Sequence, residues 1–207
     1  MGGMTCSHSL IIPFPEDEKM KRVAAAVNLP TVRLRQWRQS DLEALVALNA
    51  DPDVMEFFPR TLTPDESQAM LDRLHTGIAD RGWGFWAVDV DGVCAGFTGL
   101  GVPTFKAHFT PCVEIGWRLH RAYWGKSIAY AAACQTLDYA AKTLGLSEVV
   151  SFTSVLNIRS QRLMQRLGLS TTPADDFLHP SLDESDRLRP HVLYRTSLTS
   201  PTPGGGR

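Results

Sequence analysis

The chain has 207 residues and is 43% hydrophobic and 21% charged, which predicts a single domain with short additions and a sizeable core. Its net charge of −1 provides no bulk attraction to nucleic acid or to an anionic membrane, and no apolar run approaches the roughly 18 residues of a membrane span. The four cysteines form no C-x-x-C pair, so we predict no metal site and a reduced, cytoplasmic setting.

The two ends of the chain differ from its centre. Residues 1–29 are weakly patterned, apart from a short helical stretch from Glu16 to Val27, and we interpret them as an N-terminal extension. Residues 199–207 are rich in turn-forming residues and are predicted to be a disordered tail. One domain is therefore expected over residues 30–198.

The first half of this domain predicts a strand, two helices and a hairpin. Alternating apolar and charged residues indicate a strand over residues 32–38. The segments 40–43 and 63–66 match the capping-box pattern and are each expected to begin a helix. Two strands, 84–89 and 93–100, flank Asp91-Gly92, a dipeptide typical of a tight hairpin turn.

The second half alternates strands and helices. We predict a strand over 113–119, a glycine-containing turn, a helix to about Leu144 that Gly145 stops, and a strand over 148–154. A helix over 157–167 and a closing strand over 191–198 follow. This order predicts a mixed α/β sheet whose glycine turn lies at the carboxyl end of a strand, where ligands commonly bind.

The turn has the chemistry of an anion site. Backbone N–H groups at a helix N-terminus have no intrahelical partner and face the positive end of the helix dipole, which suits a pyrophosphate. Gly125 lets a ligand approach the backbone, and Lys126 adds a positive charge. An ordinary strand-to-helix connection is the alternative reading. Neither the phosphate loop of kinases nor the G-x-G-x-x-G dinucleotide pattern is present.

Three segments together resemble a known family: Glu114-Ile-Gly-Trp-Arg-Leu119, then Trp124-Gly-Lys-Ser-Ile-Ala129, then Asn157-x-x-Ser160-x-x-Leu-Met-x-x-Leu-Gly168. Their order and spacing are similar to those of the GCN5-related N-acetyltransferase (GNAT) superfamily. Within it, the chain is most similar to the branch that includes the acetyltransferases of ribosomal-protein N-termini. The resemblance extends over about 165 residues, from Thr31 to Leu198.

The resemblance implies an α/β fold with a mixed, mostly antiparallel sheet of about seven strands flanked by helices. Two neighbouring parallel strands, 113–119 and 148–154, would splay apart to hold acetyl-CoA as co-substrate. The pyrophosphate would lie on the glycine turn, Asn157 would contact the pantetheine arm, and a backbone N–H of the fourth strand would hold the thioester carbonyl. The residues implied to bind acetyl-CoA are Trp117, Arg118, Leu119, Trp124, Gly125, Lys126, Ser127, Ile128, Ala129, Asn157 and Ser160.

Glu114 is the expected general base, because acetyl transfer requires an uncharged amine and the family often keeps an acid on this strand. A structural carboxylate paired with Arg118 is the alternative. His179 and His191 are rival bases, since histidine titrates near neutral pH.

Ser160 is the residue expected to protonate or hydrogen-bond the leaving thiolate, and a serine that caps local backbone is the alternative. Tyr123 and Tyr194 are further candidate acids. Cys112 and Cys134 do not have the setting of an acyl carrier. The aromatic residues considered for the acceptor side are Phe57, Phe58, Trp83, Trp86 and Phe105.

The predicted function is an N-acetyltransferase that moves an acetyl group from acetyl-CoA directly to a primary amine of a protein N-terminus, an amino acid or another small amine. The sequence departs from the family pattern at Ala122, Ser127 and Ala131. Ser127 and Ala131 keep open the alternative, a catalytically silent acyl-CoA-binding or regulatory module. No nucleic-acid or membrane partner is predicted, and a homodimer is left open.

Overall fold

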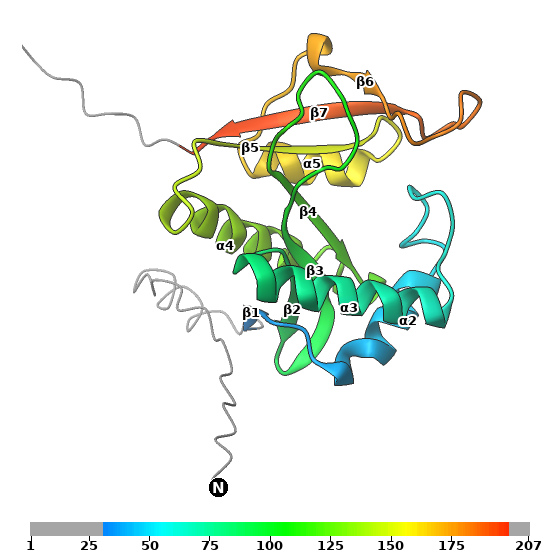
Figure 1. The fold of residues 1–207 in the computed structure, drawn as a ribbon, viewed down its shortest axis with the longest axis vertical. Helices are drawn as coiled ribbons and strands as arrows, with labels where there is room; N and C mark the ends of the chain where they lie inside the picture. The colour runs from blue at the N-terminus through cyan, green and yellow to red at the C-terminus, as the bar shows by residue number, and fades with distance from the viewer. Residues whose placement is uncertain (1–30, 199–207) are drawn as a thin grey trace, which may run out of the picture.

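The computed structural model describes residues 31–198, so the predictions for 1–29 and 199–207, the helix 16–27 included, lie outside the described residues. Seven strands form one mixed sheet in the order β1-β2-β3-β4-β5-β7-β6 (Figure 1). The strands are β1 (Val32–Arg35), β2 (Phe85–Val90), β3 (Val93–Gly101), β4 (Glu114–Leu119), β5 (Glu148–Ser154), β6 (Phe177–Leu178) and β7 (Pro190–Ser197). The α-helices are α2 (Leu42–Ala50), α3 (Pro64–Arg81), α4 (Ile128–Lys142) and α5 (Ile158–Arg166), with short 3-10 turns at Gln39–Asp41, Arg121–Tyr123 and Pro173–Asp175.

Helices cover both faces of the sheet. Helix α4 packs on β1, β3 and β4, and α5 packs on β5 and against α4. Helices α2 and α3 pack on β3 and β2 from the opposite face. The alternation of strand side chains shows this division: Trp86 meets Tyr139 of α4 edge to face, whereas the ring of its neighbour Phe85 lies over Gly116.

The sheet opens between β4 and β5. Strands β3 and β4 pair continuously from Gly101–Glu114 to Gly96–Leu119. The parallel β4–β5 ladder has only one register pair, Glu114 with Val150, and the Ser151 hydroxyl donates to the Ile115 carbonyl just beyond it at 2.9 Å. The carboxyl-terminal parts of the two strands then run apart. The prediction of a seven-stranded mixed sheet with one parallel pair is confirmed.

Local signals were confirmed in some places and wrong in others. Thr63 caps α3 reciprocally with Glu66, and Asp91-Gly92 makes the hairpin turn with positive φ at both residues. The segment 40–43 does begin a helix, since α2 starts at Leu42, but Ser40 is not its cap: it lies in a 3-10 turn in which the Asp41 carboxylate accepts from Arg35 and from the Arg38 N–H. The first strand ends at Arg35, earlier than predicted. The two-residue strand β6 has no signal in the sequence.

Within residues 31–198 no helix is long and apolar enough to cross a membrane. In the same range no three histidine, cysteine or acidic side chains gather in a way that could hold a metal ion.

Because Thr63 accepts the Glu66 N–H at 3.2 Å and Glu66 accepts the Thr63 N–H at 2.9 Å, Thr63→Ala is expected to lower the free energy of unfolding by about 1 kcal/mol. The melting temperature should fall by about 2–4 °C. Ser40→Ala is the matched control, since Ser40 caps no helix and should change stability by less than about 0.5 kcal/mol. Equal losses in the two variants would contradict this capping assignment.

Candidate functional site

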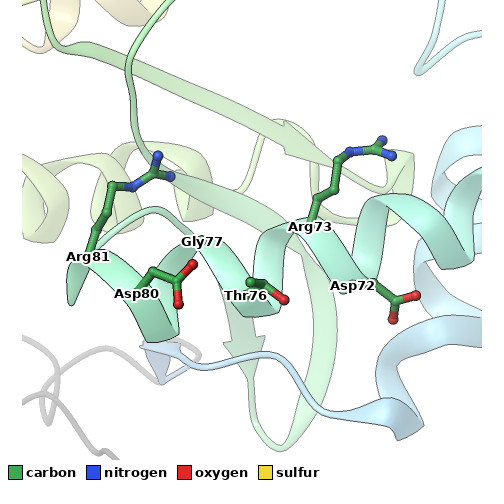
Figure 2. Close-up of a pocket in the computed structure, with 6 residues that line it drawn as sticks. All are labelled: Asp72, Arg73, Thr76, Gly77, Asp80 and Arg81. Carbon is green, nitrogen blue, oxygen red and sulfur yellow. The ribbon is translucent and has the colours of Figure 1, made fainter.

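The gap between β4 and β5 opens into a cleft of about 730 Å³, a size typical of small-molecule sites. Its walls come from β4, β5, the glycine turn (residues 124–127), α5 and the loop between α2 and α3. A second hollow, of about 400 Å³, lies on α3. Figure 2 shows that its six lining residues all come from that one helix, with Arg73 and Arg81 extending away from it. The cleft alone combines strand ends, a helix N-terminus and titratable groups.

Backbone groups of β4 point into the cleft. Successive residues of a strand direct their N–H and C=O groups to opposite neighbours. The His120 N–H donates to Ala95 of β3, and the Ile115 carbonyl accepts from Ser151 of β5, so odd-numbered residues face β5. Since the ladder to β5 ends at Glu114, the N–H groups of Trp117 and Leu119 face the opening. Such N–H groups can donate to a carbonyl oxygen placed between the strands.

Glu114 lines the cleft at the point where β4 and β5 part. Its side chain lies beside Gly101 and the Phe85 ring, and no cationic side chain of residues 31–198 lies within ion-pair distance of it. Burial in this apolar setting raises the pKa of the Glu114 carboxyl to about 7. A carboxylate with that pKa can take a proton at neutral pH and release it again.

The alternative role for Glu114, pairing with Arg118, is wrong. The Arg118 guanidinium extends to the α2–α3 side, where Nη1 donates to the Asn49 Oδ1 at 2.7 Å. Asn49 is fully buried and donates in turn to Ser67 of α3 at 3.1 Å, so this amide joins β4 to both helices. Arg118 also lies over the Phe58 ring, 3.9 Å from its centroid.

The glycine turn leads into α4 as predicted. Gly125 has φ of 71°, which favours glycine, and Ser127 adopts a left-handed φ of 59° that costs a residue with a Cβ about 1–2 kcal/mol. The first intrahelical bond runs from the Ala131 N–H to the Ser127 carbonyl, so the N–H groups of Ser127 to Tyr130 have no partner in the helix. The Trp124 N–H is already bonded to Arg121, a correction to the predicted set of free donors.

Two predicted binding residues lie differently from the rest. The Ile128 side chain is buried in the core, and Lys126 is exposed and does not line the cleft. At Ile128 only the backbone can meet a ligand in the cleft. The other predicted cofactor-binding residues that line the cleft are Trp117, Arg118, Leu119, Trp124, Gly125, Ser127, Ala129, Asn157 and Ser160.

Asn157 and Ser160 stand together at the start of α5. The Asn157 Oδ1 accepts the Ser160 N–H at 3.1 Å, and its Nδ2 donates to Thr153 of β5 at 3.1 Å. Asn157 is thus a helix cap, as one reading predicted, while also lining the cleft. The cap fixes its amide at the cleft wall, opposite β4.

Three arginines on α5 line the cleft and were missed from the sequence: Arg159, Arg162 and Arg166. Their spacing of three and four residues places them on one helix face, which was the available signal. Arg166 donates to the Ser127 hydroxyl at 3.1 Å and lies 4.1 Å from the centroid of the Tyr130 ring, so a helix distant in sequence adds a cation to the glycine turn.

The rival bases do not lie in the cleft. His179 and His191 pack with Phe105, Phe152 and Phe177 on the β5–β7 side, their ring centroids 4.9 Å apart. Burial lowers the pKa of His191 to about 4 and also lowers the pKa of His179, so both are neutral at pH 7.

Of the two alternative tyrosine acids only one lines the cleft, and both candidate thiols stay protonated. Tyr194 is buried away from the cleft, where its hydroxyl accepts from Gln165 at 3.1 Å, whereas Tyr123 lines the cleft. Burial raises the pKa of the Cys112 thiol to about 11 and raises that of Cys134, which leaves both protonated.

The predicted acceptor aromatics divide between cleft and core. Phe57 and Phe58 line the cleft, whereas Trp86 and Trp83 belong to the core. Phe105 packs against His179, in the aromatic group beside β5 and β7. Phe85 and Phe97 line the cleft as well. We call the part of the cleft walled by Phe57, Phe58, Phe85 and Phe97 the acceptor chamber.

Comparisons with known proteins agree with this geometry. A family model described as an acetyltransferase (GNAT) domain matches residues 31–170. The chain is 32% identical over 135 residues to the FsC-acetyl coenzyme A-N(2)-transacetylase of Aspergillus fumigatus, which covers 62% of this chain and 57% of that protein. The chain thus spans little more than half the length of that relative.

Solved structures share the fold. The acetyltransferase (GNAT family) of Bacillus anthracis superposes with a TM-score of 0.66 at 20% identity, over 81% of this chain and 95% of that one. The spermidine N-acetyltransferase of Vibrio cholerae, solved with CoA and spermine, gives a TM-score of 0.63 at 17% identity, over 83% and 96% of the two chains. With the sheet, the cleft and the family match in agreement, the chain belongs to the GNAT acetyltransferase family, whose co-substrate is acetyl-CoA.

Proposed function

We propose that this acetyltransferase moves the acetyl group of acetyl-CoA directly to a primary amine, with Glu114 as the general base. The observation that carries the proposal is the position of Glu114: its carboxyl faces the cleft where β4 and β5 part, and its pKa is raised to about 7. A carboxylate with an ordinary pKa is too weak a base for an ammonium group, and burial strengthens it.

Residues of the cleft supply the other requirements of the reaction. We assign the thioester oxygen to the N–H groups of Trp117 and Leu119, which face the opening between the strands; hydrogen bonds from them would make the carbonyl carbon more electrophilic. Glu114 accepts the proton of the acceptor ammonium, directly or through a water, and the neutral amine attacks the carbonyl carbon. As the new N–C bond forms, the C–S bond breaks, the nitrogen gives up its second proton, and the departing thiolate takes up a proton to leave as the CoA thiol. We assign to the Ser160 hydroxyl, which lines the cleft, the hydrogen bond to this thiolate.

The phosphates of the co-substrate are assigned to the glycine turn. The free N–H groups at the start of α4 supply donors, and Arg166 supplies a charge close to Ser127. This arrangement compensates for Ala122, where the family pattern usually has a polar or basic residue. It therefore weakens the case for a silent module.

The acceptor is proposed to be an amino-acid-like amine or a peptide N-terminus. The resemblance to the ribosomal-protein N-terminal acetyltransferase branch supports this class, as does the aromatic acceptor chamber, which suits an apolar group beside the amine. The relatives' printed names mention other acceptors: FsC, with transfer to N(2), and spermidine. Calorimetry with acetyl-CoA followed by a free-thiol release assay over an amine panel tests the proposal. Co-substrate binding without thiol release on any amine would favour the silent module.

Glu114→Gln should lower kcat/KM for the best acceptor by about 10²–10⁴. In the wild-type protein the base is active when ionised, so kcat/KM should rise with pH and level off above about pH 7. The variant should lack this rise and keep its affinity for acetyl-CoA, as measured by calorimetry. A variant with an unchanged pH–rate profile would rule out Glu114 as the base.

The same substitution should stabilise the fold at high pH. A folded-state pKa raised from 4.5 to about 7 means that the folded chain binds more protons than the unfolded chain between these values, so ionisation of Glu114 costs stability as pH rises. The free energy of unfolding of Glu114→Gln should exceed that of the wild type by about 3 kcal/mol at pH 8 and match it at pH 4. Urea denaturation at both pH values measures this, with the exposed Glu43→Gln as control; a difference that does not depend on pH would contradict the assigned pKa.

Arg166→Ala should raise the KM for acetyl-CoA about tenfold, the value of one charge-assisted hydrogen bond, with a smaller effect on kcat. Arg187→Ala is the control, because Arg187 bonds the Glu56 carbonyl at 3.2 Å and does not line the cleft. Acetyl-pantetheine lacks the phosphates of acetyl-CoA. If Arg166→Ala raised the KM for this thioester as strongly as it raises the KM for acetyl-CoA, Arg166 would not contact a phosphate.

A further inference from the structure

The Arg118 guanidinium is a cation without a carboxylate partner in the wall of the acceptor chamber. Within residues 31–198 no acidic side chain lies within ion-pair distance of it. Its Nη1 donates to Asn49, and its Nε is buried without a hydrogen-bond partner in that range. Its Nη2 makes no hydrogen bond within residues 31–198 and, unlike Nε, is not fully buried. It is therefore accessible from the cleft that Arg118 lines.

Aromatic rings shield the Arg118 guanidinium from water but offer it no hydrogen-bond acceptors. The guanidinium lies 3.9 Å from the centroid of the Phe58 ring and 5.2 Å from that of Phe97. Aromatic faces attract a cation but accept no strong hydrogen bond. Burial lowers the pKa of Arg118 to about 10, which still leaves it charged at neutral pH. A buried charge with unfilled donors binds an anion more strongly than the same group does in water.

Several other arginines of the fold have carboxylate partners. Arg159, on the opposite side of the cleft, pairs with Glu56 at 2.8 Å. Arg35 pairs with both Asp41 and Asp89, at 2.7 and 2.8 Å. Arg118 differs in that its one bonded partner is the neutral amide of Asn49, which orients the guanidinium and leaves its charge uncompensated.

Glu114 and Arg118 lie on the same face of β4, on either side of Gly116. The strand rise separates their Cα atoms by about 13 Å, and Gly116 has no side chain to divide the space between them. Because the Phe85 ring covers this glycine, an apolar surface links the two charged groups. The chamber therefore has a base and a cation on the same face of β4, with aromatic walls beside them.

We propose that Arg118 binds a carboxylate of the acceptor, so that the substrate class of this cleft is the amino carboxylic acids with an apolar or aromatic body. The inference rests on the proposed function, since the amine of the same molecule is directed to Glu114. A guanidinium presents its N–H groups in the plane of a carboxylate, which suits this recognition better than a lysine does. Arg118 acts as a specificity residue through its side chain.

The test is a comparison of two amines that differ only in the carboxylate, phenylalanine and 2-phenylethylamine, in a free-thiol release assay with acetyl-CoA, with each rate normalised to the concentration of uncharged amine. The wild-type protein should prefer phenylalanine by about 10- to 100-fold in kcat/KM, the range for a hydrogen bond to a charged group. Arg118→Met should reduce this ratio to nearly one, and Arg118→Lys should retain part of it. Because the ratio is measured within one sample, partial misfolding of a variant lowers both rates and leaves the ratio intact.

Arg81→Met is the matched control, since Arg81 also lies over an aromatic ring, 5.3 Å from that of Trp83, but on α3 outside the cleft (Figure 2). It should leave the ratio unchanged. A wild-type ratio near one, a ratio that persists in Arg118→Met, or a tenfold preference for a peptide that begins with phenylalanine over free phenylalanine would each overturn the inference.

Calorimetry on the CoA complex separates this inference from the proposed function. The reaction product N-acetylphenylalanine should bind at least tenfold more tightly than N-(2-phenylethyl)acetamide, and the difference should disappear in Arg118→Met. If no amine is acetylated, the proposed function fails, yet this binding difference still supports the carboxylate subsite. If both amines are acetylated equally and both products bind equally, the proposed function stands and the subsite does not exist.

Discussion

The early end of the β4–β5 ladder is the constraint on which the site depends. One register pair joins the two strands, whereas β3 and β4 pair along their whole common length. A sheet interior ordinarily satisfies every backbone N–H, so the groups of Trp117 and Leu119 that face the opening require another partner. The cleft thus leaves backbone N–H groups unpaired, which we assign to the acyl thioester, and the N-terminus of α4 adds further free donors, which we assign to the phosphates.

Burial shifts the pKa values of Glu114 and Arg118, both on β4, in opposite directions, and each shift suits the role proposed for the residue. The apolar walls disfavour charge, so they raise the pKa of Glu114 and lower that of Arg118. Glu114 responds by holding its proton at neutral pH, which makes it a stronger base. Arg118 stays charged and lacks a counter-ion, which makes it a stronger anion binder. Asn49 connects this arrangement to the core, because its fully buried amide holds α2, α3 and β4 together.

Contacts between residues distant in the sequence determine which side chains reach the cleft, and local sequence patterns do not show these contacts. The three arginines of α5 have little meaning in a list of motifs, but helix packing brings Arg166 to Ser127, 39 residues away in sequence. Similarly, His179 and His191 were reasonable bases by residue type until their strands placed them in an aromatic cluster.

The sequence by itself determined the order of the elements, the capping of α3, the hairpin at Asp91-Gly92, the turn before α4 and the family, because each of these is written in residues close together in the chain. It also named Glu114, Asn157 and Ser160 from the spacing of the family's segments. Only the tertiary structure decided that Glu114 is free of Arg118, that Phe85 and Phe97 join Phe58 in one chamber, and that Arg118 faces it unpaired. These properties depend on burial and on distances between strands and helices, and a pattern along the chain contains neither.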